Sequence, residues 1–314
     1  MNSKVCFSEW ANNWLETVKG TVKANTYQAT YRNTVVNHLI PEFGDRYLDE
    51  IKPYELQQFL NRSSEKYCHD TVKKFKSCLV QIFDEAVYND FCEKNPCYRL
   101  KVIKQLTTEE QTIHTPQQID LIQDFALTHR FGLDIMLLSE TGMRRGELLG
   151  LIWENIDLSN KAIYIKQAAA IVKNNDGKNT VVIGAPKNKS SIRVIPISSQ
   201  FATYLANKKR SVNARSQDFV IRNYNSTVCN PRTWQRRHYD VFMHDMQQYY
   251  LKQGVFIPIY TPHNLRHSRA SAWVNNGLNL YAVARALGHA DLDMLRKRYA
   301  HSDIEQLRQL LQIV

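Results

Sequence analysis

Apolar residues recur at helical spacing through the first hundred positions of the chain. They repeat every three or four residues in FSEWANNWLETV, residues 7–18, and again as one apolar stripe over 70–90. A further helix is expected over 54–61. Turn-forming residues separate these helices at Pro41, Gly44 and Pro53. The pattern predicts a compact domain of four or five helices over residues 1–103.

The periodicity then weakens in the mixed-charge stretch RLKVIKQLTTEEQTIH, and we place a linker there, over 104–114. Thr115 and Pro116 follow as a helix start, because threonine caps free amides and proline suits the first helical turn. We therefore expect a second domain over 115–314.

The second domain changes its period along its length. Helices are expected across 116–128 and 131–150, followed by short strands and, after residue 198, by helices again. The strands are expected at 162–172, 179–185 and 192–197, joined by the turns NNDGKN and PKNKSS. The predicted fold class is mainly α with a small three-stranded antiparallel sheet.

Composition narrows the class of protein. The 314 residues are 43% hydrophobic and 23% charged, as in ordinary globular proteins. No apolar run reaches the roughly 18–20 residues of a membrane span, and the first residues lack the apolar core of a signal peptide. We expect a cytoplasmic protein, associated with the nucleoid when DNA is bound, and no membrane contact.

The spacing of the cysteines and the distribution of charge indicate which ligands the protein could bind. The six cysteines form no C-x-x-C pair, so we expect reduced thiols and no bound metal or other cofactor. The net charge of +11 is uneven: residues 1–110 hold 15 basic and 15 acidic residues, whereas residues 111–314 hold 26 and 15. A basic second domain suits a polyanion such as nucleic acid, although a merely basic, soluble surface is an equal alternative on charge alone.

Three segments carry candidate chemistry. In TPHNLRHSRAS, residues 261–271, His263 and Arg266 share one face of a helix start, where free amides favour a phosphate. In TGMRRGELLGLIW, residues 141–153, Arg144 begins a helix and Glu147 lies one turn later, where it could hold a neighbouring arginine in place. Taken singly, each of these pairs is more simply explained as ordinary helix-surface residues.

The third segment is LGHADLDMLRKRYAHSD, residues 287–303. Gly288 breaks a helix, His289 sits at the break, and Tyr299 follows ten residues later inside a basic run. Spacing alone does not distinguish Tyr299 from a core tyrosine, since the chain has 16 tyrosines.

In this order and register the three segments resemble the tyrosine recombinase (phage integrase) family. The resemblance covers nearly the whole chain and includes a lysine-bearing turn, here GAPKNKSSIRVIP, and a first domain similar to the family's core-binding domain. It implies catalytic and supporting roles for Arg144, Arg266, His263, His289 and Tyr299, with Glu147 supporting Arg144. It also implies a catalytic lysine, for which Lys187 is preferred and Lys189 is the alternative.

The resemblance implies a reaction as well. Tyr299 would attack a DNA phosphodiester and form a 3′-phosphotyrosine, without metal or ATP, and strand exchange would pass through a Holliday junction. The family's partners would be double-stranded DNA at two recombination sites, a homo-tetramer assembled there from monomers, and an accessory DNA-bending or excision factor. A C-terminal tail helix, SDIEQLRQLLQIV, would dock on a neighbouring protomer or on its own domain.

Two rivals stay open. A type IB topoisomerase shares the catalytic residues, but the compact first domain and the spacing from His289 to Tyr299 argue against it. A catalytically inactive DNA-binding relative is disfavoured because all six expected positions are filled. The core-binding pattern starts almost at Met1, so the arm-binding module of many integrases is expected to be absent, which puts regulated directionality in doubt.

Overall fold

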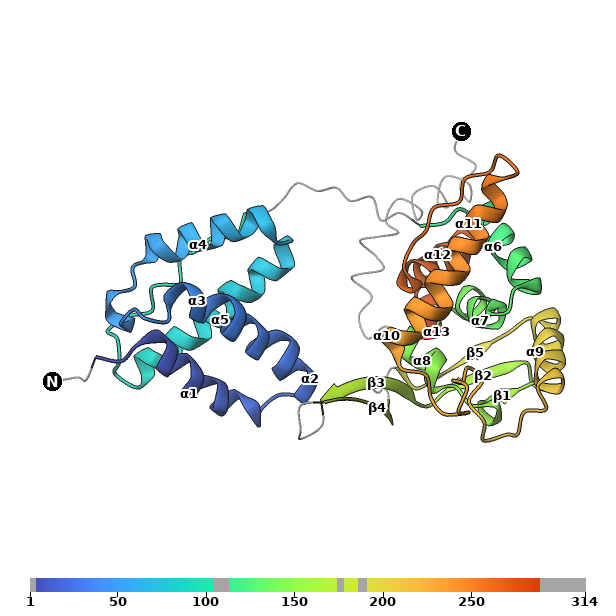
Figure 1. The fold of residues 1–314 in the computed structure, drawn as a ribbon, viewed down its shortest axis with the longest axis horizontal. Coiled ribbons are helices and arrows are strands. Elements are labelled where there is room, and N and C mark those ends of the chain that lie inside the picture. Colours follow the sequence, from blue (N-terminus) through green and yellow to red (C-terminus); the bar gives the residue numbers. More distant parts are fainter. Residues whose placement is uncertain (1–3, 104–112, 174–177, 186–190, 289–314) are drawn as a thin grey trace. The chain divides into compact units, whose positions relative to one another are not determined.

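The computed structural model describes residues 4–103, 113–173, 178–185 and 191–288. The chain divides into two compact units, one within residues 1–109 and the other within 110–314. Each has its own apolar core. In Figure 1 the first unit runs from blue to cyan and the second from green to orange.

The first unit consists of helices and helical turns. Its α-helices are α1 (Phe7–Lys19), α2 (Ala24–Thr26), α3 (Ile40–Phe43), α4 (Pro53–Lys66) and α5 (His69–Tyr88). The chain between α2 and α3 continues as wider π-helical turns over Tyr27–Arg32 and Val35–Leu39.

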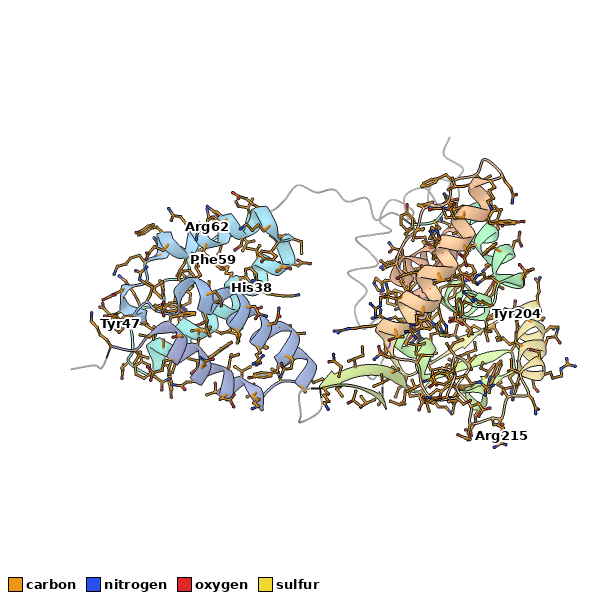
Figure 2. The ribbon with its side chains drawn as sticks, viewed as in Figure 1. His38, Tyr47, Phe59, Arg62, Tyr204 and Arg215 are labelled. Carbon is orange, nitrogen blue, oxygen red and sulfur yellow. The ribbon has the colours of Figure 1, made fainter. Side chains whose placement is uncertain are left out.

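The apolar stripes predicted for α1 and α5 form the core of this unit. Phe7 packs edge-on against Phe43, with 5.8 Å between ring centroids, and is also 6.0 Å from Phe83 of α5. Phe59 of α4 lies against Phe75 of α5, and the ring of His38 contacts Phe75 as well. Figure 2 labels Phe59 and His38 in this unit. The helical periodicity of residues 7–18 and 70–90 is therefore confirmed.

The second unit combines eight described α-helices with short strands. The helices are α6 (Pro116–Thr128), α7 (Gly132–Thr141), α8 (Arg145–Gly150), α9 (Ser199–Ser211), α10 (Pro231–Trp234), α11 (Asp240–Leu251), α12 (Pro262–Asn275) and α13 (Leu280–Leu287). α7 packs against both α6 and α12, and α13 packs against α12 through Val274, Val283 and Leu287.

The strands form two small antiparallel sheets. They are β1 (Ile156–Asp157), β2 (Ala162–Ile165), β3 (Ala168–Lys173), β4 (Asn179–Gly184) and β5 (Arg193–Pro196). One sheet has the order β1-β2-β5, with Ile163 opposite Ile195, and the other is the pair β3-β4. The class, mainly α with small antiparallel strands, is confirmed.

The expected set of three strands differs from the observed one. Residues 162–172 are two strands rather than one, because the chain leaves the first sheet at Lys166 and Gln167. The side chain of Gln167 there donates to the carbonyl oxygen of Gly150, 2.8 Å away, which ties the break to α8. The split lets β2 pair with β5 and leaves β3 to pair with β4.

Close backbone contacts position α8. A Cβ added to Gly146 would lie 2.7 Å from the carbonyl oxygen of Ala169, and one added to Gly150 would lie 2.9 Å from the Cα of Ala168. Both glycines therefore allow α8 to pack directly on β3, at the point where the candidate motif TGMRRGE begins its helix.

His114 belongs to the second unit. It is 2% exposed, its backbone amide donates to Ser268 Oγ at 3.1 Å, and its ring Nε2 is 2.9 Å from the carbonyl oxygen of Pro258. These contacts attach the chain just before α6 to α12 and to the segment that leads into α12.

Candidate active site

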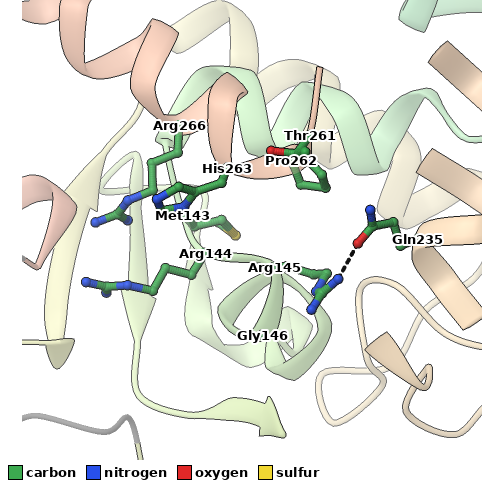
Figure 3. Close-up of a pocket in the computed structure, with 9 residues that line it drawn as sticks. All are labelled: Met143, Arg144, Arg145, Gly146, Gln235, Thr261, Pro262, His263 and Arg266. Carbon is green, nitrogen blue, oxygen red and sulfur yellow. Dashed lines mark hydrogen bonds between the residues drawn. The ribbon is translucent and has the colours of Figure 1, made fainter. Parts of the chain in front are cut away.

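A cavity of about 380 Å³ opens between the start of α8 and the start of α12. Three of the residues predicted to act chemically, Arg144, His263 and Arg266, line it together (Figure 3). The other lining residues are Met143, Arg145, Gly146, Gln235, Thr261 and Pro262. Segments more than a hundred residues apart in the sequence thus meet around one space.

The start of α12 is set by its own sequence. Thr261 has extended backbone dihedrals, and its amide donates to Asn264 Oδ1 at 3.1 Å, while Pro262 occupies the first turn. The predicted helix start at Thr261 is confirmed. His263 and Arg266 therefore lie one turn apart on the helix, and the His263 ring packs edge-on against His267, with centroids 4.3 Å apart.

The turn before α8 depends on a glycine. Gly142 ends α7 in the left-handed region at φ +61, and a Cβ there would lie 2.9 Å from Leu287 Cδ2. Non-glycine residues adopt this backbone conformation at a cost of roughly 1–2 kcal/mol. The turn delivers Arg144 in an extended conformation directly before α8.

Glu147 holds Arg144 at two points. Its Oε2 accepts from the backbone amide of Arg144 and its Oε1 from the guanidinium, each at 2.8 Å. The carboxylate is almost fully buried, whereas the Arg144 side chain is 38% exposed. Glu147 therefore contacts both the backbone and the side chain of Arg144, the arginine for which a supporting role of Glu147 is predicted.

Sequence reasoning missed a second partner of Glu147. Arg193, the first residue of β5, donates from Nη2 to Glu147 Oε2 at 2.8 Å and from Nη1 to Oε1 at 3.0 Å. A signal for it exists: Arg193 and Ile195 share the buried face of a strand whose other face is exposed. A charged residue at an inward position of a strand needs a buried partner.

The charge of Glu147 is maintained by these arginines. Burial on its own would raise the pKa of the carboxyl, but the hydrogen bonds and charge of Arg193, with those of Arg144, hold the pKa below its usual range. Glu147 is therefore ionised at neutral pH.

Three successive carbonyl groups at the end of α13 accept from three arginines. The carbonyl oxygen of Ala286 accepts from Arg193 Nε at 2.6 Å. The next, that of Leu287, accepts from Arg266 Nη2 at 2.6 Å, and that of Gly288 accepts from Arg144 Nη2 at 2.8 Å. A helix C-terminus carries partial negative charge, so it suits this role.

Arg266 is the most buried of these arginines. It is 1% exposed, and its Nη1 also donates to the carbonyl oxygen of Gly142 at 2.8 Å. Burial, together with the nearby charge of Arg144, lowers the pKa of Arg266 to about 9, so it remains protonated at pH 7. Among the described residues, its Nε has no hydrogen-bond partner.

The cluster carries more positive than negative charge. Within the described part of the chain, Arg144 and Arg193 both pair with the Glu147 carboxylate, and Arg266 adds a third guanidinium that is hydrogen-bonded only to backbone carbonyl oxygens. Buried charge without an opposite charge is costly, and an anion would compensate it. Guanidinium forks match the oxygens of a phosphate at two points.

Several predicted site residues lie outside the described residues. They are Lys187, Lys189, His289 and Tyr299. His289 directly follows Gly288 in the sequence, and Gly288 ends α13 in the left-handed region at φ +69. The predicted helix break at Gly288 is confirmed.

The described residues also bear on two other kinds of site, a metal centre and a membrane span. No group of three His, Cys, Asp or Glu side chains there could hold a metal ion. None of the described helices is long and apolar enough to cross a bilayer.

Comparison with protein families decides the class. A model of the phage integrase family matches residues 109–306, and a model of the phage integrase central domain matches residues 7–102. This chain belongs to the phage integrase family. The resemblance drawn from the sequence motifs is therefore confirmed.

Curated relatives of this family member are distant in sequence. It is 28% identical to the transposase from transposon Tn916 of Enterococcus faecalis, over 84% of this chain and 66% of that protein. The chain thus spans just under two thirds of that relative's length. It is 26% identical to a XerC-like tyrosine recombinase of Caldanaerobacter subterraneus subsp. tengcongensis, over 95% of this chain and 79% of the relative.

Solved structures share the fold. The Tn1549 transposon integrase in complex with a circular intermediate DNA superposes with a TM-score of 0.77 at 20% identity, covering 97% of this chain and all of that one. A lambda integrase tetramer bound to a Holliday junction gives a TM-score of 0.66 at 16% identity, covering 95% and 78%. This family member therefore has the two-domain tyrosine recombinase fold.

Proposed function

We propose that this protein is a site-specific DNA recombinase that cuts and rejoins double-stranded DNA through a covalent bond to Tyr299. The observation that carries the proposal is the arginine cluster at the cavity. Arg144 and Arg266 line one cavity, and together they carry more positive charge than the Glu147 carboxylate beside them neutralises. Membership of the phage integrase family supports the same conclusion.

The two arginines hold the reacting phosphate. Negative charge gathers on the non-bridging oxygens when a nucleophile adds to phosphorus, and Arg144 and Arg266 stabilise that charge. By analogy with oxyanion donors, each contributes roughly 3–4 kcal/mol to the transition state. The unpaired Nε of Arg266 is a donor already desolvated for this purpose.

Proton transfers accompany the attack. A tyrosine hydroxyl in water has a pKa near 10, so only about 0.1% is phenolate at pH 7 and a base has to remove its proton. In this proposal His263 accepts the proton of Tyr299. The Tyr299 oxygen bonds to phosphorus as the bond to the deoxyribose 5′ oxygen breaks. Lys187, or else Lys189, donates a proton to that leaving oxygen, and His289 donates a hydrogen bond to the phosphate.

Rejoining is the reverse of cleavage with a different 5′ hydroxyl. The phosphotyrosine keeps the energy of the phosphodiester, so a 5′ hydroxyl from a second DNA restores the bond without ATP and returns the proton to Tyr299. Two such exchanges pass through a Holliday junction. We propose that four copies of the chain assemble on two DNA sites in the cytoplasm. The predicted C-terminal tail helix, which lies outside the described residues, would dock on a neighbouring protomer or on its own domain.

A nicked duplex tests this function. The Tyr299→Phe protein first selects a bound duplex of about 30 bp from a randomised library. A nick placed in that duplex lets the short 5′-hydroxyl fragment leave after cleavage, so that rejoining fails. The unmodified protein should then accumulate as a denaturant-resistant DNA adduct. Tyr299→Phe should bind the duplex without forming the adduct.

A second tyrosine variant serves as the matched control. Tyr224 is 96% exposed and does not line the cavity. Tyr224→Phe should form the adduct at the normal rate. An adduct of full yield from Tyr299→Phe would refute the assignment of the nucleophile.

A further inference from the structure

Arg145 lines the same cavity as Arg144 but on its other side. Arg144 has extended backbone dihedrals, φ −74 and ψ 152, and successive side chains of extended backbone point in opposite directions. Figure 3 shows Arg144 on the side of Arg266, whereas Arg145 points toward Gln235. Arginine side chains therefore line this cavity on both of its sides.

The surroundings of Arg145 leave its charge uncompensated. Its Nη1 donates to the amide oxygen Oε1 of Gln235, a neutral acceptor. Burial lowers the pKa of Arg145, and the nearby charge of Arg232 lowers it further. Within the described residues, Arg145 forms no ion pair with a carboxylate, in contrast to Arg144 and Arg193.

The amide side chain at residue 235 helps to distinguish two roles for Arg145, a structural tether and a group that binds an anion. A mere tether between α8 and the turn Gln235–Tyr239 would be stronger with a carboxylate, because charge-assisted hydrogen bonds are about twice as strong as neutral ones. An amide orients the guanidinium but leaves its positive charge for another partner. A guanidinium also retains further donors, since it carries five N–H groups.

We propose that Arg145, oriented by Gln235, binds a second phosphate of the DNA strand that is cut. This inference rests on the proposed function, in which Arg144 and Arg266 hold the reacting phosphate. Phosphates recur along a strand about every 3.4 Å of helix rise, so a strand bound at one side of the cavity brings another phosphate to the other side. Binding at two phosphates fixes the direction of the strand as well as its position.

The test removes single charges from both molecules. The selected duplex is prepared in versions that each carry one neutral methylphosphonate near the cleavage position. Binding is compared between Tyr299→Phe and the double variant Arg145→Gln with Tyr299→Phe. At one phosphate beside the reacting one, the methylphosphonate should weaken binding by Tyr299→Phe about tenfold, as expected for a charge-assisted hydrogen bond. The double variant should lose less than about twofold there.

Two further variants separate the contact from a structural tether. Gln235→Glu places a carboxylate against Arg145 and should reproduce the reduced sensitivity to that methylphosphonate, although it strengthens the link to α8. Arg215→Gln is the matched control, because Arg215 is exposed and does not line the cavity (Figure 2). It should keep the sensitivity of Tyr299→Phe at that phosphate.

Three results would overturn the inference. The first is an identical methylphosphonate profile with and without the Arg145→Gln change. The second is a loss of binding that depends on which base pair adjoins the methylphosphonate and not on the position of the neutralised phosphate. The third is undiminished sensitivity in Gln235→Glu. Adduct formation by protein with Tyr299 on the nicked duplex is scored separately. An adduct with an unchanged profile therefore refutes this inference alone, whereas an absent adduct refutes the proposed function whatever the methylphosphonate profile is.

Discussion

Arg193 and Glu147 form a two-point ion pair in which both side chains are almost fully buried, with exposed fractions of 3% and 2%. The pair joins the first residue of β5 to the first turn of α8. Arg193 also donates to the carbonyl oxygen of Ala286, so the same guanidinium reaches the end of α13. The pair thus connects the three elements that surround Arg144.

Removing Arg193 should destabilise the second unit strongly. Arg193→Met leaves Glu147 buried with only Arg144 as an ionic partner, and breaking a buried pair in this way typically costs about 3–5 kcal/mol. Urea unfolding measures the change. The control is Arg222→Met, which breaks the more exposed pair between Arg222 and Asp218 and should cost less than about 1 kcal/mol. Equal losses in the two variants would contradict this role for Arg193.

Acid should weaken the contribution of Glu147. The fold holds the pKa of this carboxyl below its ordinary value of 4.5, so its stabilisation is complete above pH 4.5 and is lost as the pH falls through the folded-state pKa. The difference in the free energy of unfolding between the natural protein and Glu147→Gln should therefore narrow below pH 4.5. Urea unfolding at pH 7 and at successively lower pH gives that difference. A constant difference would show that Glu147 does not titrate in this way.

Arg144→Ala and Arg266→Ala should slow cleavage far more than they weaken binding. Both groups act on charge that develops in the transition state, and the loss of one such donor costs about 10²–10³ in rate. Single-turnover adduct formation and equilibrium binding to the same duplex give the two quantities. Equal losses in rate and affinity would instead make these arginines ground-state binding residues.

Gly142→Ala should destabilise the turn between α7 and α8. Residue 142 has a φ of +61, which a residue with a Cβ adopts only at a cost, and the added Cβ would lie 2.9 Å from Leu287 Cδ2. We therefore expect the free energy of unfolding to fall by about 1–2 kcal/mol or more. Gly184→Ala is the matched control, because an added Cβ there meets nothing within 4 Å. Thermal unfolding of the two variants should rank Gly142→Ala as clearly the less stable.

Local signals in the sequence predicted the parts of the site that depend on local chemistry. The Thr-Pro pair at 261 and 262 marks the start of α12, and the three-residue spacing from Arg144 to Glu147 implies their contact on one helix turn. The helix break at Gly288 is likewise a property of that glycine. Such features are read correctly because each depends on a few neighbouring residues.

Local sequence patterns did not predict which distant segments of the chain contact one another. The contact from Arg193 to Glu147 joins residues 46 positions apart and depends on how β5 pairs with β2. The break at Lys166 and Gln167 is also a tertiary effect, since Gln167 turns to the carbonyl of Gly150. Apolar alternation predicts that strands form, but it does not specify which strands pair.

The covalent bond between protein and DNA gives the most direct measurement. Adduct trapped on the nicked duplex is digested with trypsin, which cuts after Arg298 and releases residues 299–308, and the nucleotide-bearing peptide is sequenced by mass spectrometry. We predict that the DNA is attached to Tyr299 through its 3′ phosphate, with a free 5′ hydroxyl on the released fragment. Attachment to a different residue, or through a 5′ phosphate, would contradict the proposed chemistry.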